Sequence, residues 1–354
     1  MKKELRYELV PQMKTYDRLG FEWLPYLMFS QTPNFRSDTI NTDKNGYRFS
    51  NKEDVSFQSI FDVKKKDQES DGVNLILGNS FGFGVGALND KGTISGILNN
   101  NNIYYNIACR AHVGFQEIIS VFSNINKFKK IKKIIVISGI ADFYLSNYFK
   151  MTYPDLLYFN SQFLNSMNKS RINKKKRLSK FFLDIFFPKT LNEENIWKLN
   201  SNNIIEFVTS KEFRETFKTN NTDFTTVSFE EKLERNFSIY RLFKSHFSCE
   251  VEFYLNPILN WSKELCEEEK KLHEYSNKYF SSLSKFAFKL FTEDNHNHLS
   301  NLLKKVSSKN DIPFYDANLY FKEVTSKNDW LFVDGAHCNN DGYKIMSDYI
   351  SLNK

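Results

Sequence analysis

Apolar stretches alternate with amphipathic stretches between residues 73 and 138, and this pattern constrains the fold more than any other. Strands buried on both faces are predicted at VNLIL and KKIIVIS, with a further strand at NNIYYNIA. Helices are predicted between them at TISGILNN and GFQEIISVFSNI, where apolar residues recur at helical spacing. Strands that alternate with helices at this interval pair in parallel. The sequence therefore predicts an α/β protein with three layers, a parallel sheet flanked by helices.

The strand–helix alternation is interrupted in the middle of the chain. Residues 1–70 are rich in aromatic and turn-forming residues, and we expect an irregular lead-in packed on the core. Residues 146–245 are polar, basic and Phe-rich, and we expect them to form a largely helical insertion of ordinary domain size. The α/β domain then comprises 71–145 and 246–354, where CEVEFYLNP predicts another strand and DGYKIMSDYISL the closing helix.

Charge and hydropathy exclude some classes of protein. The net charge is +7 over 354 residues, and a visible part of the basic excess lies in KSRINKKKR. This local patch does not predict a nucleic-acid partner. No signal-like segment opens the chain, and no run approaches the ~18 apolar residues of a membrane span. We expect a cytoplasmic protein, whose basic and aromatic residues 169–187 either contact an anionic membrane surface or form a solvated surface.

The histidines of EDNHNHLS and the cysteines are residue types that bind metals, but their context favours structural roles. His296 and His298 in EDNHNHLS are expected to form a solvated polar turn, and the acidic run CEEEKK an exposed helix face. The cysteines have no CxxC spacing, which favours reduced thiols over a zinc site or disulfides. They are Cys109, Cys249, Cys266 and Cys338. We therefore expect no metal site.

Glycines surround Ser80, and three hypotheses explain them. GNSFG matches the G-x-S-x-G elbow of α/β-hydrolases, but VNLIL is the first clear strand, whereas that fold places its serine strand well inside the sheet order. GFGVGA fits a dinucleotide fingerprint, but it does not begin directly after the strand, and the second strand ends without an acidic residue. The third hypothesis is a nucleophilic serine at the carboxyl end of the first strand, where open α/β sheets bind ligands. Its structural alternative is a small residue that caps the following helix.

Asp334 and His337 supply the partners that a nucleophilic serine needs. They lie three residues apart in the loop before the last helix. An Asp-x-x-His loop lets the carboxylate hold one imidazole nitrogen while the other faces the serine. Such a site needs neither a metal nor an organic cofactor. The alternative is that His337 is a structural loop histidine, whose only role is a hydrogen bond with Asp334.

With these residues, the chain resembles the SGNH (GDSL-like) hydrolase superfamily over most of its α/β part. GNSFGFGVGALND resembles the first block of that family, with Ser80 as nucleophile and Asn79 where Asp is more usual. VDGAHCNNDGY resembles the last block, with Asp334 and His337. YLNPILNW is similar to a segment of members linked to bacterial surface polysaccharides. The resemblance implies an SGNH/flavodoxin-like fold.

The resemblance also implies an oxyanion hole that involves the amide of Ser80. NIACRAHVGFQE resembles the second block, whose small residue donates a backbone N–H, and either Gly114 or Ala111 occupies that place. SGIADFY lies at the third block, where Ala141 replaces the usual asparagine. Losing one such donor typically costs about 2.7–4 kcal/mol of transition-state stabilisation.

Three outcomes of this replacement stay open: the two backbone amides suffice, Arg110 or His112 substitutes, or the activity is weak or lost. Asp142 is expected to stabilise the loop after the third strand, beside the site.

The resemblance implies a serine esterase that acts on an acyl ester of a carbohydrate, chiefly an O-acetyl ester, through an acyl-enzyme. The substrate would be an acylated carbohydrate or a lipid-linked glycan. Two alternatives remain open: an O-acyltransferase with the same residues, and a catalytically decayed glycan-binding or scaffold protein.

Overall fold

The computed structural model describes seven stretches of the chain: 4–24, 26–50, 72–99, 104–128, 130–149, 228–279 and 289–353. All of them belong to one compact unit, which comprises Met1–Lys150, Asp155–Tyr158 and Ser228–Lys354. The basic and aromatic segment 169–187 and most of the expected insertion lie outside the described residues. Within these seven stretches, no helix has both the length and the hydropathy to cross a membrane.

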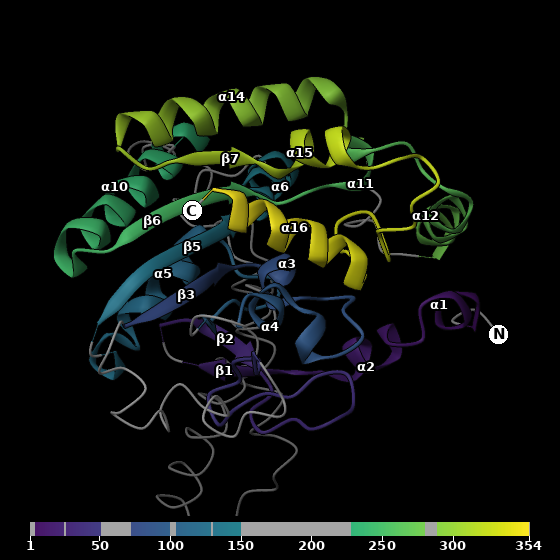
Figure 1. Cartoon of the computed structure of the whole chain (residues 1–354), viewed down its shortest axis with the longest axis horizontal. Helices are drawn as coiled ribbons and strands as arrows, with labels where there is room; N and C mark the ends of the chain where they lie inside the picture. Colours follow the sequence, from purple (N-terminus) through teal and green to yellow (C-terminus); the bar gives the residue numbers. More distant parts are fainter. Residues whose placement is uncertain are drawn as a thin grey trace, which may run out of the picture. The chain divides into compact units, whose positions relative to one another are not determined.

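A five-stranded parallel sheet lies at the centre of this unit, with the strand order β4-β3-β5-β6-β7 (Figure 1). The strands are β3 (Val73–Gly78), β4 (Tyr104–Asn106), β5 (Ile131–Ser138), β6 (Glu250–Leu255) and β7 (Phe314–Asp316). The second strand in sequence thus lies at one edge, the first beside it, and the others follow. This is the flavodoxin-like order. The predicted three-layer α/β fold is confirmed.

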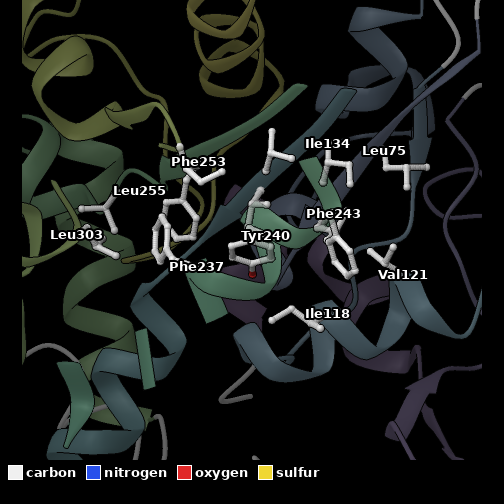
Figure 2. Packing of buried hydrophobic residues seen from close by; sticks show 14 of the residues in the cluster. Leu75, Ile118, Val121, Ile134, Phe237, Tyr240, Phe243, Phe253, Leu255 and Leu303 are labelled. Carbon is white, nitrogen blue, oxygen red and sulfur yellow. The ribbon is translucent and has the colours of Figure 1, made fainter. Parts of the chain in front are cut away.

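Alternate residues of the strands supply two hydrophobic cores. On one face, Leu75, Ile134 and Phe253 pack under a first set of helices (Figure 2). These helices are α5 (Gly114–Phe122), α6 (Ile140–Phe149), α10 (Phe229–Phe247) and α14 (Glu293–Lys309). On the other face, Ile76 and Ile135 pack under a second set. That set comprises α3 (Ser80–Phe83), α4 (Ile94–Leu98), α15 (Ala317–Val324) and α16 (Asn340–Leu352).

The core resumes earlier than the sequence pattern indicates. Helix α10 begins at Phe229, inside the expected insertion, and Ser228 caps it with a reciprocal bond pair to Glu231. Its apolar side chains Phe237 and Tyr240 are 0% and 1% exposed and pack against the sheet. The sequence pattern did not separate this helix from the insertion, because its polar and Phe-rich composition resembles that of the preceding residues.

The two expected solvated elements are only partly solvated. His296 and His298 lie in α14, where a turn was expected, and the His296 Nε2 lies 2.8 Å from Asp316 Oδ2 with both side chains buried. The acidic run begins α12 (Glu267–Tyr279), but its Glu269 is 1% exposed and bonds Lys263 Nζ at 2.6 Å. The expectations were wrong for His296 and Glu269, because Asp316 bonds the first and the N–H groups of Leu331 and Phe332 bond the second, and periodicity does not reveal such distant partners.

The expected lead-in has regular elements of its own and a buried hydrophobic face. Its elements are α1 (Glu4–Leu9), α2 (Met13–Arg18) and an antiparallel hairpin of β1 (Phe21–Leu24) and β2 (Met28–Gln31). Met13 and Tyr16 pack with Phe83 and Val85, which follow the first strand of the sheet. Short elements elsewhere are α11 (Leu259–Ser262), η3 (Asp90–Gly92) and η4 (Ile125–Lys127).

Arg48 joins the lead-in to the core through a fully buried ion pair. Its Nε donates to Asp90 Oδ1 at 2.8 Å, and both side chains are 0% exposed. Its Nη1 donates to the Tyr16 hydroxyl and to the carbonyl oxygens of Phe83 and Gly84. One guanidinium thus satisfies several carbonyls at the end of α3. The loop that follows is also held by Gln12, which donates to the Gly86 carbonyl, and by Tyr343, which donates to the Val85 carbonyl.

We predict that Arg48→Met destabilises the protein by about 3–5 kcal/mol, because it leaves the Asp90 carboxylate buried without its counter-charge. The midpoint of urea unfolding at pH 7 measures this change. Lys305→Met is the matched control, since the Lys305–Glu230 pair is exposed and should shift the midpoint little. Equal shifts for the two variants would contradict the assigned role of Arg48.

Candidate active site

Ser80 stands directly after the first strand of the sheet, at the carboxyl edge. Asn79 caps the short helix α3 by accepting the Phe81 N–H at 2.9 Å. Gly84 ends this helix in the left-handed region, with φ 88°, and a Cβ there would lie 2.6 Å from the Thr93 side chain. The tight turn between Asn79 and Gly84 therefore fixes the serine at the first position of α3. Asn79, which stands where Asp is more usual in the first block, is 3% exposed and acts as this cap.

The loop that carries Asp334 and His337 is held by hydrogen bonds between its own residues. Asp334 Oδ1 accepts the N–H groups of Ala336 and His337 at 3.0 Å each, and Val333 N–H donates to the His337 carbonyl at 2.9 Å. The His337 Nδ1 lies 2.8 Å from the same carboxylate oxygen. Since an ionised carboxylate only accepts, Nδ1 carries the hydrogen and Nε2 is left as an acceptor.

Ser80 and His337, which are 257 residues apart in sequence, form a hydrogen bond of 2.7 Å between Oγ and Nε2. Ser80, His337 and Asp334 thus form a continuous chain of hydrogen bonds. The side chains of His337 and Asp334 are 20% and 12% exposed, so a small molecule can reach the imidazole while the carboxylate is largely covered. In such an arrangement the imidazole can accept the serine proton as the oxygen attacks an electrophile, and the carboxylate stabilises the imidazolium.

Electrostatics keep the Asp334 carboxylate ionised. Its burial acts to raise the pKa, but the charge and hydrogen bond of His337, the Arg6 guanidinium and the Ala336 amide outweigh burial and lower the pKa to about 2. The carboxylate is therefore negatively charged at every pH at which the protein would work.

The backbone distinguishes the two candidates for the second-block amide. Gly114 N–H donates to Asp142 Oδ2 at 2.9 Å and is already satisfied. The amides of Ser80 and Ala111 donate no hydrogen bond within the described part of the chain. Ala111 also has φ 62°, in the left-handed region that favours glycine. Ala111 therefore fits the small-residue position better than Gly114.

Arg110 and His112 hold the lead-in instead of supplying substitute donors. Arg110 donates to Gln31 Oε1 at 2.5 Å, and to the carbonyls of Tyr16 and Leu19. His112 Nε2 lies 2.9 Å from the Phe29 carbonyl, and burial lowers the pKa of this imidazole to about 4 although that bond raises it. The imidazole is neutral and buried. Both side chains are engaged with residues 16–31, so neither is placed as a substitute donor for the oxyanion hole.

Ala141 lies in the first turn of α6 and is 6% exposed. Its methyl group offers no hydrogen-bond donor, so the side-chain amide that the usual asparagine would supply at this position is missing. Sequence reasoning also missed three buried polar residues near Asp142, namely Glu117, Asn236 and Tyr240. A lone acid within the apolar pattern of GFQEIISVF was the only local signal for Glu117.

No family model matches the sequence, and no curated protein matches it. Among solved structures, the acetyl xylan esterase AlAXEase is 10% identical, covers 79% of this chain and 99% of its own, and has a TM-score of 0.39. A GDSL-like lipase from Bacteroides thetaiotaomicron is 11% identical, covers 82% and 89%, and has a TM-score of 0.37. A two-domain esterase active on acetylated mannans is 8% identical, covers 81% and 50%, and has a TM-score of 0.39. At these scores, the assignment of fold and site rests on strand order and geometry.

We predict that Asp334→Asn destabilises the protein by about 2 kcal/mol at pH 7, because the folded pKa lies below the ordinary value of about 3.9. A carboxylate with a lowered folded pKa stabilises above its unfolded pKa, and this stabilisation is lost as the pH falls toward about 2. Urea unfolding of both proteins should therefore show a difference that falls to about half near pH 3. A difference that stays constant from pH 7 to pH 3 would contradict the lowered pKa.

Proposed function

We propose that this protein is a serine esterase whose nucleophile is Ser80. His337 accepts the serine proton through Nε2, and Asp334 holds the imidazole through Nδ1. The serine oxygen attacks the acyl carbon, and the alcohol leaves with the proton from His337. Water then cleaves the acyl-enzyme by the reverse use of the same imidazole. The amides of Ser80 and Ala111 donate to the carbonyl oxygen as it becomes an oxyanion.

The hydrogen bond between Ser80 Oγ and His337 Nε2 is the observation that carries this proposal. A serine that only caps α3 would not need an imidazole at 2.7 Å, nor a largely covered carboxylate on the far nitrogen of that ring. The cap is supplied by Asn79, which leaves the Ser80 hydroxyl without that structural task.

The proposed substrate is an O-acylated, chiefly O-acetylated, carbohydrate. This part of the proposal rests on the resemblance of the sequence motifs and not on a contact in the site. Water gives hydrolysis, and a sugar hydroxyl in its place gives acyl transfer. Exclusion of water from the acyl-enzyme decides between them.

A second candidate function is a glycan-binding protein on a decayed hydrolase fold. The absence of a donor at Ala141 favours it, since one oxyanion donor is typically worth about 10²–10³-fold in kcat. Retention of the full hydrogen-bond chain at Ser80 opposes it, because a site without selection for catalysis does not need a serine hydroxyl bonded to an imidazole that is held by a carboxylate.

We predict that Ser80→Ala and His337→Ala each lower kcat on p-nitrophenyl acetate by about 10⁴-fold, and that the double variant loses little more. The three groups act as a unit, so their losses do not add. Ser347→Ala is the matched control, because this buried serine only bonds the Tyr343 carbonyl within α16. Turnover by folded Ser80→Ala at the rate of the unchanged protein would exclude the serine mechanism.

A further inference from the structure

Two hydrogen bonds connect the start of α5 with the turn between β5 and α6. The Ser138 hydroxyl, at the end of β5, donates to Glu117 Oε1 at 2.7 Å. In the opposite direction, Gly114 N–H at the start of α5 donates to Asp142 Oδ2 at 2.9 Å. These bonds therefore tie the second-block segment, which carries Ala111, to the third-block segment, which carries Ala141.

Helix α10 covers the contact between the start of α5 and the start of α6. Asn236 and Tyr240 are 3% and 1% exposed. A Cβ on Gly114 would lie 2.6 Å from Asn236 Nδ2, so a larger residue there would require the Asn236 side chain of α10 to move. Figure 2 shows Tyr240 among the apolar side chains of α10 and α5. The cluster is thus enclosed by three helices and the end of a strand.

Two carboxyl groups share this enclosed space. Burial, followed by the charge of Asp142, raises the pKa of Glu117 well above its ordinary value, although the hydrogen bond from Ser138 acts to lower it. Burial and the charges of Glu117 and Asp142 likewise raise the pKa of Tyr240. The environment of Glu117 therefore favours its protonated form more than water does, and the Gly114 amide donates to Asp142 rather than to Glu117.

We propose that Asp142 is a positioning residue for the esterase reaction: through Gly114 it fixes the turn that aims the Ala111 amide at the oxyanion. This inference rests on the proposed function. The turn from Cys109 to Gly114 is held at its other end by the Cys109 N–H, which donates to the Gly78 carbonyl at 3.1 Å. Between these two anchors Ala111 adopts φ 62°.

A residue other than glycine in the left-handed region stores strain, which persists only where surrounding contacts impose it. Arg110 and His112 keep the turn attached to the lead-in, so loss of the Gly114 anchor shifts the Ala111 amide without unfolding the turn. The site lacks the third-block amide at Ala141, so it depends on the remaining amides more than a complete oxyanion hole would. A small displacement of a donor reduces the stabilisation of the transition state more than it reduces substrate binding.

The test compares kcat and KM on p-nitrophenyl acetate for the unchanged protein, Asp142→Ala and Asp142→Asn. Asp142→Ala should lower kcat by about tenfold or more with KM changed by less than about threefold. Asp142→Asn should recover most of kcat, because its Oδ1 still accepts the Gly114 N–H. Hydrogen exchange at the Gly114 amide should be about tenfold faster in Asp142→Ala than in the unchanged protein.

Asp316→Ala is the matched control. Asp316 is a buried carboxylate that accepts a backbone N–H at the start of a helix, α15, but it ends β7, and two strands separate β7 from β3. Its loss should lower stability and leave kcat unchanged. If Asp142→Ala does not fold, Asp142→Leu keeps the shape without an acceptor.

The outcomes separate the two proposals. The positioning role is overturned if the unchanged protein is active and folded Asp142→Ala has the same kcat. It is also overturned if Asp142→Asn and Asp142→Ala lose activity equally. Both results leave the esterase proposal intact. No ester turnover by the unchanged protein overturns the esterase proposal, and the positioning role with it. Unchanged exchange at Gly114 in Asp142→Ala overturns the anchor itself, whatever the activity.

Discussion

The buried guanidinium of Arg48 is the interaction on which the position of the candidate nucleophile depends. Its Nη1 bonds the carbonyls of Phe83 and Gly84, which end the single helical turn that begins at Ser80. Its Nε bonds Asp90, which in turn accepts from Asn41 of the lead-in. A charge removed from water must be fully paired to be tolerated, so every one of these groups has to occupy its place. The lead-in is therefore part of the framework of the site.

The sheet supplies the second condition, because parallel strands bring their carboxyl ends to one edge. Ser80 follows β3, Ala111 follows β4 and Ala141 follows β5, which are neighbours in the strand order. His337 reaches the same edge from the loop before α16. Ligands bind at this edge of open α/β sheets, where the strand order reverses. Segments far apart in sequence can thus form one site without any local motif that joins them.

The sequence predicted those features that depend on local pattern. The runs of β3 and β5 are apolar enough to identify without tertiary information, and the spacing of Asp334 and His337 limits how an imidazole and a carboxylate can meet. Features that depend on distant partners were not predictable. The choice between Ala111 and Gly114 needed a backbone angle and a hydrogen bond to Asp142. The burial of His296 could be inferred only once its partner Asp316 was known, and that of Glu117 only once its partner Ser138 was known. No periodicity encodes such pairs, because each lies across two elements.

Labelling with a fluorophosphonate, followed by intact mass and peptide mapping, tests the nucleophile most directly. The reagent forms a stable bond only with a serine whose proton has an acceptor beside it, and this reaction needs no knowledge of the substrate. We expect one adduct per chain, on the peptide that contains Ser80, and no adduct in a folded His337→Ala variant. A folded, unmodified protein, or an adduct on any other serine, would contradict the proposal that Ser80 is an activated nucleophile.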